Sequence, residues 1–345
     1  MKLFNDIKRK ILGPAVILLV VPLLHGCGRI AQATPSSASD MLMGTFVRVI
    51  LYPSAGLAVP PDGAINSAIE LAKALEDRLS LYNPKSALND LNRTRVSTGD
   101  PDLFTVIRRA TEISRSTGGE FDVTVAPILK RNGFYSEVPR QILDLIPDND
   151  TGVSWTNIKL DETNGSVSIA DGTCLDLSGI AKGYIVDRMA GKMKEQGAEH
   201  FLINAGGDIY CTEKKDGSAW KIGLRDPRTG KVLITLGIKN AAVATSGDYE
   251  NKVTDRGSGE VVSHIIDPST DGPVKLKPSS VTVIAVDCMT ADALATGMMA
   301  MGAEKAVDLA DSIEGVEVIT VDEPGSDVVV RYSASARAYV LGGQE

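Results

Sequence analysis

The chain has 345 residues and a formal charge of −8 at pH 7. About 305 residues follow Met41, which is enough for one elaborate domain or two merged ones. An acidic chain without a basic stripe argues against nucleic acid as a partner. The cysteines have neither the spacing of a zinc site nor that of a disulfide framework, although a bridge between Cys174 and Cys211 stays open.

The beginning of the chain has the pattern of a targeting segment. Basic residues precede an apolar run from Ile11 to Leu24, which is too short to span a membrane. The run leads into a sequence ending at Cys27 that resembles a bacterial lipobox. We therefore expect a lipoprotein signal peptide over residues 1–26, and a lipidated Cys27 on a flexible tether over residues 27–40. An ordinary signal peptide and an uncleaved anchor are the alternatives.

Removal of residues 1–26 would delete four basic side chains and one acidic one, which takes the formal charge from −8 to −11. Beyond Met41, periodic patterns predict strands and helices. Strands are expected at residues 43–51, 155–160, 167–169, 200–203, 220–224, 232–238, 242–245, 261–266, 281–286, 316–321, 328–332 and 338–341. Helices are expected at residues 64–79, 102–116, 178–197, 290–302 and 304–313. Because the elements do not follow a regular βαβ order, the predicted fold class is α+β.

The stretch from residue 173 to 208 combines a polar turn, a helix and a glycine turn. Ser178 stands where the helix N-cap is expected, and Gly197 stands where the helix should stop. This layout directs free backbone N–H groups and a helix N-terminus toward one place, which suits a phosphate-bearing ligand. Asp176 and Asp208 border the same turns, and carboxylates next to phosphates usually need a metal between them.

Asp292 and Thr296 are four residues apart in a predicted helix, so their side chains project from one face. A carboxylate and a hydroxyl so placed suit Mg²⁺. The alternative is an acid that complements its helix dipole and a threonine bonded back to its own helix. Lys182, in the first turn of the central helix, opposes the helix dipole; either a bound anion compensates it or the side chain extends to water.

His264 is predicted within a strand, where a satisfied core histidine and a general acid or base are both open. The residues from Thr245 to Tyr249 either donate hydroxyl groups to a ligand or form a simple turn. The sequence lacks the phosphate-binding loop, dinucleotide-binding, zinc-protease and nucleophile-elbow motifs. The commonest nucleotide-binding and hydrolase machinery is therefore excluded.

Eight short motifs follow one another along the chain. They are Met43-Gly-Thr45, Leu79-Ser-Leu-Tyr82, Gly119-Glu-Phe-Asp-Val-Thr124, Asp176-Leu-Ser-Gly-Ile-Ala-Lys-Gly183, Asn204-Ala-Gly-Gly-Asp208, Ala244-Thr-Ser-Gly247, His264-Ile-Ile-Asp-Pro268 and Asp292-Ala-Leu-Ala-Thr296. In this order they resemble the ApbE family of FAD:protein FMN transferases, also called flavin transferases. The resemblance covers Met41 to roughly Gly342. It implies one elaborate domain over residues 41–345, with mixed sheets and packed helices related to the T-fold.

The resemblance also implies roles for individual residues. Magnesium would be held by the backbone carbonyl of Gly179 and by the side chains of Asp292 and Thr296. His264 matches a histidine with an implied catalytic role. The positions implied to bind FAD are Met43, Tyr82, Glu120, Phe121, Asp122, Asp176, Lys182, Asn204 and Ser246.

The activity implied by the resemblance is Mg²⁺-dependent transfer of FMN from FAD, the substrate, to a Ser or Thr hydroxyl of an acceptor protein, with release of AMP. The acceptor would carry a short Ser/Thr motif, as subunits of membrane redox complexes do. The enzyme would be lipid-anchored in the cell envelope and face the periplasm. Two alternatives stay open: a Mg²⁺-dependent FAD pyrophosphatase, and a non-catalytic flavin-binding lipoprotein.

Overall fold

The structure, a computed structural model, describes residues 34–247, 253–254, 261–262, 266–267, 272–273, 278–322 and 327–343. The predicted signal peptide, Cys27 and His264 lie outside these residues, so the statements about them stay predictions. The described residues belong to one compact unit. None of their helices combines the length and the apolar character that crossing a membrane requires.

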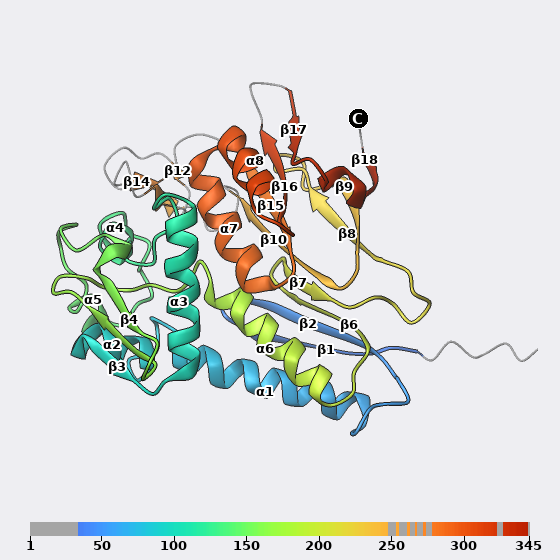
Figure 1. The fold of residues 1–345 in the computed structure, drawn as a ribbon, viewed down its shortest axis with the longest axis horizontal. Coiled ribbons are helices and arrows are strands. Elements are labelled where there is room, and N and C mark those ends of the chain that lie inside the picture. The colour runs from blue at the N-terminus through green and yellow to red at the C-terminus, as the bar shows by residue number, and fades with distance from the viewer. Residues whose placement is uncertain are drawn as a thin grey trace, which may run out of the picture. The chain divides into compact units, whose positions relative to one another are not determined.

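An eight-stranded antiparallel sheet runs through the molecule (Figure 1). In spatial order its strands are β1 (Ser36–Leu42), β2 (Thr45–Tyr52), β6 (His200–Ala205), β7 (Asp208–Cys211), β10 (Ala241–Gly247), β15 (Ser280–Ala285), β16 (Glu317–Asp322) and β17 (Val329–Tyr332). Successive side chains of a strand point to opposite faces of the sheet. Both faces of this sheet are apolar, because alternate residues of its strands belong to two separate apolar clusters. In β10, for example, Ala242 and Ala244 belong to one apolar cluster and Val243 belongs to the other.

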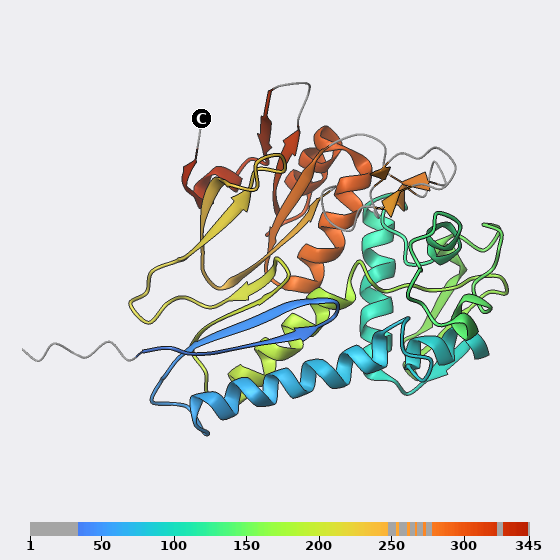
Figure 2. The ribbon, with the colours of Figure 1, turned by 180° about the vertical axis from the view of Figure 1, so that it is seen from behind.

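Helices cover one face of the main sheet, and a small sheet covers the other (Figures 1 and 2). The helices are α1 (Pro61–Leu79), α6 (Ala181–Glu195), α7 (Cys288–Met301) and α8 (Ala303–Ser312). The small antiparallel sheet consists of β18 (Val340–Gly343), β9 (Val232–Ile238) and β8 (Trp220–Arg225). The central helix α6 packs against both α1 and α7, so its N-terminus is held inside the helical layer.

Short elements between α1 and α6 form a further part of the molecule, on the left in Figure 1. They are α2 (Ala87–Thr94), β3 (Val96–Thr98), α3 (Pro101–Ser116), α4 (Ala126–Arg131), α5 (Arg140–Leu143), the 3₁₀ helix η1 (Trp155–Asn157), β4 (Ile158–Asp161) and β5 (Ser166–Ile169). The remaining elements are β11 (Val253–Thr254), β12 (Val261–Val262), β13 (Ile266–Asp267), β14 (Gly272–Pro273) and the 3₁₀ helix η2 (Ala336–Tyr339). Helix α3 packs against α7 and so connects this part to the helical layer.

The predicted class, mixed sheets with packed helices in one domain, is confirmed. Some short elements were missed, because apolar periodicity carries little signal in them. In α2, for instance, two of the buried residues are Asn89 and Asn92, whose side-chain amides donate to the backbone carbonyls of Leu81 and Leu175. The strand predicted at residues 155–160 begins only at β4, after the 3₁₀ helix η1.

The predicted tether is wrong for residues 36–40, which form most of β1. Every residue of β1 pairs with a residue of β2, from Ser36 with Leu51 to Leu42 with Thr45. Exposed and partly buried side chains alternate along β1, as in an edge strand with one face toward solvent. Serines at two of the exposed positions, Ser37 and Ser39, gave this strand the composition of a linker.

Candidate active site

A turn just before α6 sets where the helix begins. Asp176 accepts a hydrogen bond from the N–H of Ser178 at 2.8 Å, and the carbonyl of Leu177 accepts from the N–H groups of Ile180 and Ala181. The helix therefore starts at Ala181 with Ile180 as N-cap, and the predicted cap at Ser178 is wrong because that residue belongs to the turn. The side chain of the N-cap residue Ile180 does not cap this helix end, so N–H groups of the first turn need acceptors from elsewhere in the protein.

Helices α6 and α7 approach closely at Gly183. A Cβ at this position would lie 2.3 Å from the carbonyl oxygen of Cys288, so the approach requires glycine. The N–H of Gly183 donates to Oδ2 of Asp292 at 2.9 Å. Asp292 therefore complements the N-terminus of the neighbouring helix, and the alternative in which it serves its own helix is wrong.

The first turn of α7 is capped from two helices. Asp287, the N-cap, accepts from the N–H of Thr290 at 2.7 Å. Asp187 of α6 accepts from the N–H groups of Cys288 and Met289, both at 2.8 Å. Burial raises the pKa of the Asp187 carboxyl to about 7, although the two N–H donors oppose this shift. Asp187 thus fixes α7 relative to α6.

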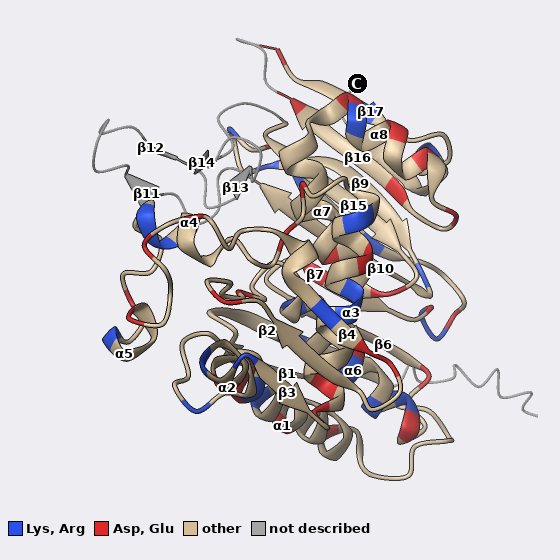
Figure 3. Cartoon of the chain, turned by 60° about the vertical axis from the view of Figure 1, so that its left-hand side comes forward, with Lys and Arg blue, Asp and Glu red and all other residues tan. Residues whose placement is uncertain are grey.

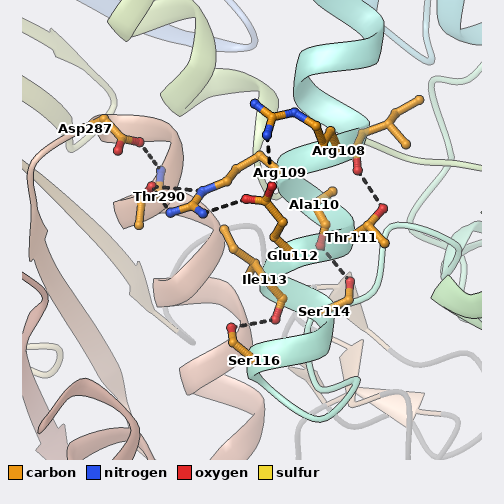
Figure 4. Close-up of polar contacts among 11 residues, drawn as sticks. Arg108, Arg109, Ala110, Thr111, Glu112, Ile113, Ser114, Ser116, Asp287 and Thr290 are labelled. Atoms are coloured by element: carbon orange, nitrogen blue, oxygen red, sulfur yellow. Dashed lines mark hydrogen bonds and ion pairs between the residues drawn. The ribbon is translucent and has the colours of Figure 1, made fainter. Parts of the chain in front are cut away.

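Arg109 ties the same turn of α7 to α3 (Figure 4). Its guanidinium donates to Oγ1 of Thr290 from Nη2 at 2.8 Å and from Nε at 3.2 Å. Glu112, on the same helix as Arg109, pairs with the guanidinium at 2.8 Å. Neighbours on two sides therefore position α7, and with it Asp292 and Thr296 in its later turns.

Lys182 joins two acids at the start of α6. Its Nζ lies 2.5 Å from Oδ2 of Asp208 on β7 and 3.4 Å from Oδ1 of Asp292 on α7. Burial alone would lower the pKa of the ammonium, but the two carboxylates outweigh it and raise this pKa above its ordinary value. The protein itself therefore supplies the negative charge that compensates Lys182, which neither sequence interpretation anticipated.

Oxygen atoms gather one turn further along α7. Oγ1 of Thr296 lies 3.5 Å from Oγ of Ser246 and donates to the carbonyl of Asp292 at 3.2 Å. A Cβ at Gly179 would lie 3.5 Å from Oγ1 of Thr296 and 3.2 Å from the ring of Phe121. The structure therefore brings two of the predicted metal-binding residues, Gly179 and Thr296, together with two predicted FAD-site residues, Phe121 and Ser246. The carboxylate of the third, Asp292, contacts the first turn of α6. The back-bonding alternative for Thr296 is also confirmed as a contact.

Two neighbouring strand connections of the main sheet place Met43 and Asn204: Met43 lies in the β1–β2 turn, and Asn204 lies near the end of β6, just before the β6–β7 turn. Met43 has a φ of 54°, and Oδ1 of Asn204 accepts from the N–H of Gly207 at 2.9 Å. The turns touch, because a Cβ at Gly206 would lie 2.4 Å from Oγ1 of Thr45. In both ribbon views the tip of the β1–β2 hairpin lies beside the start of α6 (Figures 1 and 2).

Asp176 links the turn before α6 to two tyrosines. Oδ2 of Asp176 accepts from the hydroxyl of Tyr135 at 2.5 Å, and Tyr135 is buried. Tyr82 is 50% exposed, and partial burial together with the charge of Asp176 raises the pKa of its phenol. Tyr135 was not predicted as a site residue, because residues 133–172 show no periodic pattern around it.

Asp122 holds the loop between α3 and α4. Its Oδ1 accepts from the N–H and the hydroxyl of Thr124 at 2.8 and 2.7 Å, and its Oδ2 accepts from the N–H of Trp155 at 2.8 Å. Burial raises the pKa of the Asp122 carboxyl, and these donors oppose the shift. Glu120 is half-buried and lies in the same turn. The contacts of Asp122 fix the loop, and the FAD roles of both acids stay predictions.

Cys174, Cys211 and Cys288 are buried free thiols, so Cys174 and Cys211 are not paired. Within the described part of the chain, no group of three or more His, Cys, Asp or Glu residues is arranged to hold a metal. A magnesium site here would therefore depend on one carboxylate together with hydroxyl and carbonyl oxygens. Figure 3 shows acidic and basic residues interspersed over the described chain.

The fold and the site together define a class of protein. Its members have an antiparallel sheet with helices on one face, and an oxygen-rich site where two of those helices meet. The model of the ApbE family matches residues 43–320. The chain therefore belongs to the ApbE family. This finding agrees with the resemblance that the eight sequence motifs carry.

Relatives and solved structures agree with this assignment. The FAD:protein FMN transferase of Vibrio cholerae is 32% identical over 308 residues, covering 86% of this chain and 90% of that protein. The protein of the same name from Haemophilus influenzae is 29% identical over 293 residues, covering 80% and 83%. The ApbE protein of Thermotoga maritima superimposes with a TM-score of 0.77 at 29% identity, over 89% of this chain and 99% of that one. The flavin transferase ApbE of Vibrio cholerae gives a TM-score of 0.76 at 27% identity, over 89% and 99%.

Proposed function

We propose that this protein is an FAD:protein FMN transferase, which moves FMN from FAD to a Ser or Thr hydroxyl of an acceptor protein and releases AMP. The observation that carries the proposal is that Gly179 lies against the Thr296 side chain, while the Asp292 carboxylate, one turn earlier on α7, contacts the first turn of α6. These residues lie inside the region matched to the ApbE family. Curated relatives that bear this activity in their names align with most of the chain.

The donor atoms at this site fit Mg²⁺. Asp292, Thr296 and the carbonyl of Gly179 would hold the ion, and all three offer the hard oxygen ligands that Mg²⁺ prefers. Gly179 has no side chain that would separate its backbone from the Thr296 hydroxyl. When bound, the ion supplies positive charge that neutralises a pyrophosphate.

Residues around this point would bind and orient FAD. The positive end of the α6 dipole would attract the phosphate groups of FAD. Tyr82, half-exposed near Asp176, offers an aromatic ring for stacking on the flavin or the adenine. Lys182 adds a positive charge in the first turn of helix α6.

In the proposed reaction, the acceptor hydroxyl oxygen forms a bond to the FMN-side phosphorus. The bond from that phosphorus to the bridging oxygen breaks, and AMP leaves with the bridging oxygen and the electron pair. The hydroxyl proton passes to a base, for which His264, outside the described residues, is the candidate. Positioning and charge neutralisation dominate phosphoryl transfer, so the site needs no strong nucleophile of its own.

Mass spectrometry of a candidate acceptor tests the proposal. With enzyme, FAD and Mg²⁺, the acceptor should gain one FMN, and a folded Asp292→Ala variant should give no gain. Rapid release of AMP from FAD without any acceptor would instead indicate a pyrophosphatase. FAD binding without either product would indicate a non-catalytic flavin-binding lipoprotein.

We also propose that Cys27 carries a lipid that anchors the enzyme in the cell envelope, facing the periplasm. Its acceptors would then be subunits of membrane redox complexes. The support is the lipobox-like sequence that ends at Cys27. A Cys27→Ser variant should appear in the soluble fraction and incorporate no labelled fatty acid; unchanged labelling would contradict the anchor.

A further inference from the structure

We propose that Asp208 is a positioning residue, which holds the Lys182 ammonium away from Asp292 and so keeps Asp292 available to a divalent cation. The inference rests on the magnesium site of the proposed function. It concerns how two residues of this chain that are not themselves ligands of the ion control access to that site.

The Lys182 ammonium is shared unequally between two buried acids. Its Nζ contacts Asp208 at 2.5 Å but lies 3.4 Å from Asp292, beyond an ordinary charged hydrogen bond. Both acids are nearly buried, at 3% and 4% exposure, so neither can turn to water for compensation. The ammonium therefore belongs mainly to Asp208, although Asp292 is its nearest alternative partner.

Asp208 is the rigid member of this group, and Lys182 is the flexible one. Asp208 opens β7, where it pairs with Ala205 across the β6–β7 turn, so the sheet register fixes its direction. The Lys182 side chain is 33% exposed and has a flexible four-carbon stem. Loss of the Asp208 charge would leave the ammonium free to move onto Asp292.

Such a movement would affect the oxygen atom that a cation needs. Oδ2 of Asp292 already accepts the N–H of Gly183 at 2.9 Å. Oδ1 is the atom that Lys182 approaches. An ammonium in full contact with Oδ1 would occupy the open side of the carboxylate and repel a divalent ion. Asp208 thus acts on metal binding through Lys182.

Mn²⁺ binding, measured by electron paramagnetic resonance and calorimetry without FAD, tests this inference on the folded protein. Asp208→Asn should weaken Mn²⁺ binding at least about tenfold, and Lys182→Met should strengthen it about threefold or more. The double variant Asp208→Asn, Lys182→Met should return to wild-type affinity or better, because the competing ammonium is gone. Thermal unfolding of each variant checks that it is folded.

Two controls separate positioning from other effects of the lost charge. Asp322 is a buried acid on β16 of the same sheet and pairs with Arg331, so Asp322→Asn should leave Mn²⁺ affinity unchanged. The ratio between wild type and Asp208→Asn should also persist between about 0.1 M and about 1 M KCl, where the Debye length falls from ~10 to ~3 Å. A ratio that disappears in salt would overturn the positioning mechanism in favour of a long-range charge effect.

The remaining outcomes are equally decisive. Wild-type affinity in Asp208→Asn, or weaker binding in Lys182→Met, would overturn the inference while leaving the proposed transferase untouched. Weak binding that Lys182→Met fails to rescue would make Asp208 a ligand and not a positioning residue. A wild-type protein that binds no Mn²⁺ would remove the metal site itself, and the inference with it.

Discussion

Four buried aspartates surround the start of α6, and they form two pairs that differ in what balances their charge. Asp122 and Asp176 belong to loops and accept hydrogen bonds from neutral N–H and O–H groups. Asp208 and Asp292 lie on regular elements and share the ammonium of Lys182. Neutral donors on the backbone and on buried hydroxyl side chains hold a carboxylate in one place, whereas a flexible ammonium can exchange its partner. The loop pair therefore fixes the conformation of the two loops, whereas the pair around Lys182 determines where the ammonium charge lies.

The largest expected effect compares one acid from each pair. Asp292→Asn should lower transfer of FMN at least about 10³-fold, or ~4 kcal/mol, because an amide is a poor ligand for Mg²⁺. Asp176→Asn should lower kcat less than about tenfold, since the amide oxygen can still accept one of its two hydrogen bonds. Acceptor labelling with FAD and saturating Mg²⁺ measures both.

Removal of Mg²⁺ from the wild type by a chelator is the matched control for that comparison. It should reproduce the loss seen in Asp292→Asn, and added Mg²⁺ should restore the wild type but not the variant. Equal losses of transfer in Asp292→Asn and Asp176→Asn would show that the two pairs of aspartates do not differ in function.

The next effect concerns stability, to which an acid of the loop pair should contribute more than an acid in a surface turn. Asp122→Ala removes the acceptor of three hydrogen bonds and leaves buried donors on Thr124 and Trp155, so the free energy of unfolding should fall by about 3 kcal/mol. Asp226 is the control, because it accepts from the N–H groups of Arg228 and Thr229 in the turn between β8 and β9, near the surface. Asp226→Ala should cost about 1 kcal/mol. Urea unfolding compares the two, and equal losses would contradict the assigned role of Asp122.

Asp187 extends the comparison to an acid that holds two helices together. Its folded pKa is raised to about 7 by burial, above the ordinary value of 3.8, so the folded state binds an extra proton between these pH values. Its contribution to stability is therefore fully present below pH 3.8 and is lost as pH rises through 7. The difference in unfolding free energy between wild type and Asp187→Asn should fall by about 2 kcal/mol from pH 5 to pH 7. A difference that grows with pH would mean that the two N–H donors outweigh burial.

The sequence predicted the regular elements of the fold, but not the contacts between them that build the site. Periodicity found the long strands and helices of the main sheet and its helical layer, and the spacing of Asp292 and Thr296 suggested a shared face. The contacts that build the site join residues far apart, such as Lys182 with Asp208 and Gly183 with Asp292. No local pattern contains those contacts, so only the resemblance to a family brought the residues to one site.

The misses have local causes of a different kind. Ser178 has the identity of a helix cap, yet it lies inside the turn in which the Leu177 carbonyl accepts from Ile180 and Ala181, so the helix begins only at Ala181. The residues of β1 have the composition of a linker, yet their alternation is that of an edge strand. Predictions from composition and residue identity were therefore wrong at positions where hydrogen bonds to a neighbouring segment determine the structure.

The smallest expected effect tests whether the Asp176 turn contributes to FAD binding. Tyr135→Phe removes the hydroxyl that donates to Asp176 and should cost about 1 kcal/mol of stability. Because the Asp176 turn then loses one of its two anchors, the KM for FAD should rise about threefold while kcat stays the same. Tyr210→Phe is the matched control: Tyr210 is also buried, and its hydroxyl accepts from Lys194 at 2.6 Å. That variant should lose similar stability without a change in KM, and an identical KM in both variants would place the Asp176 turn outside the FAD site.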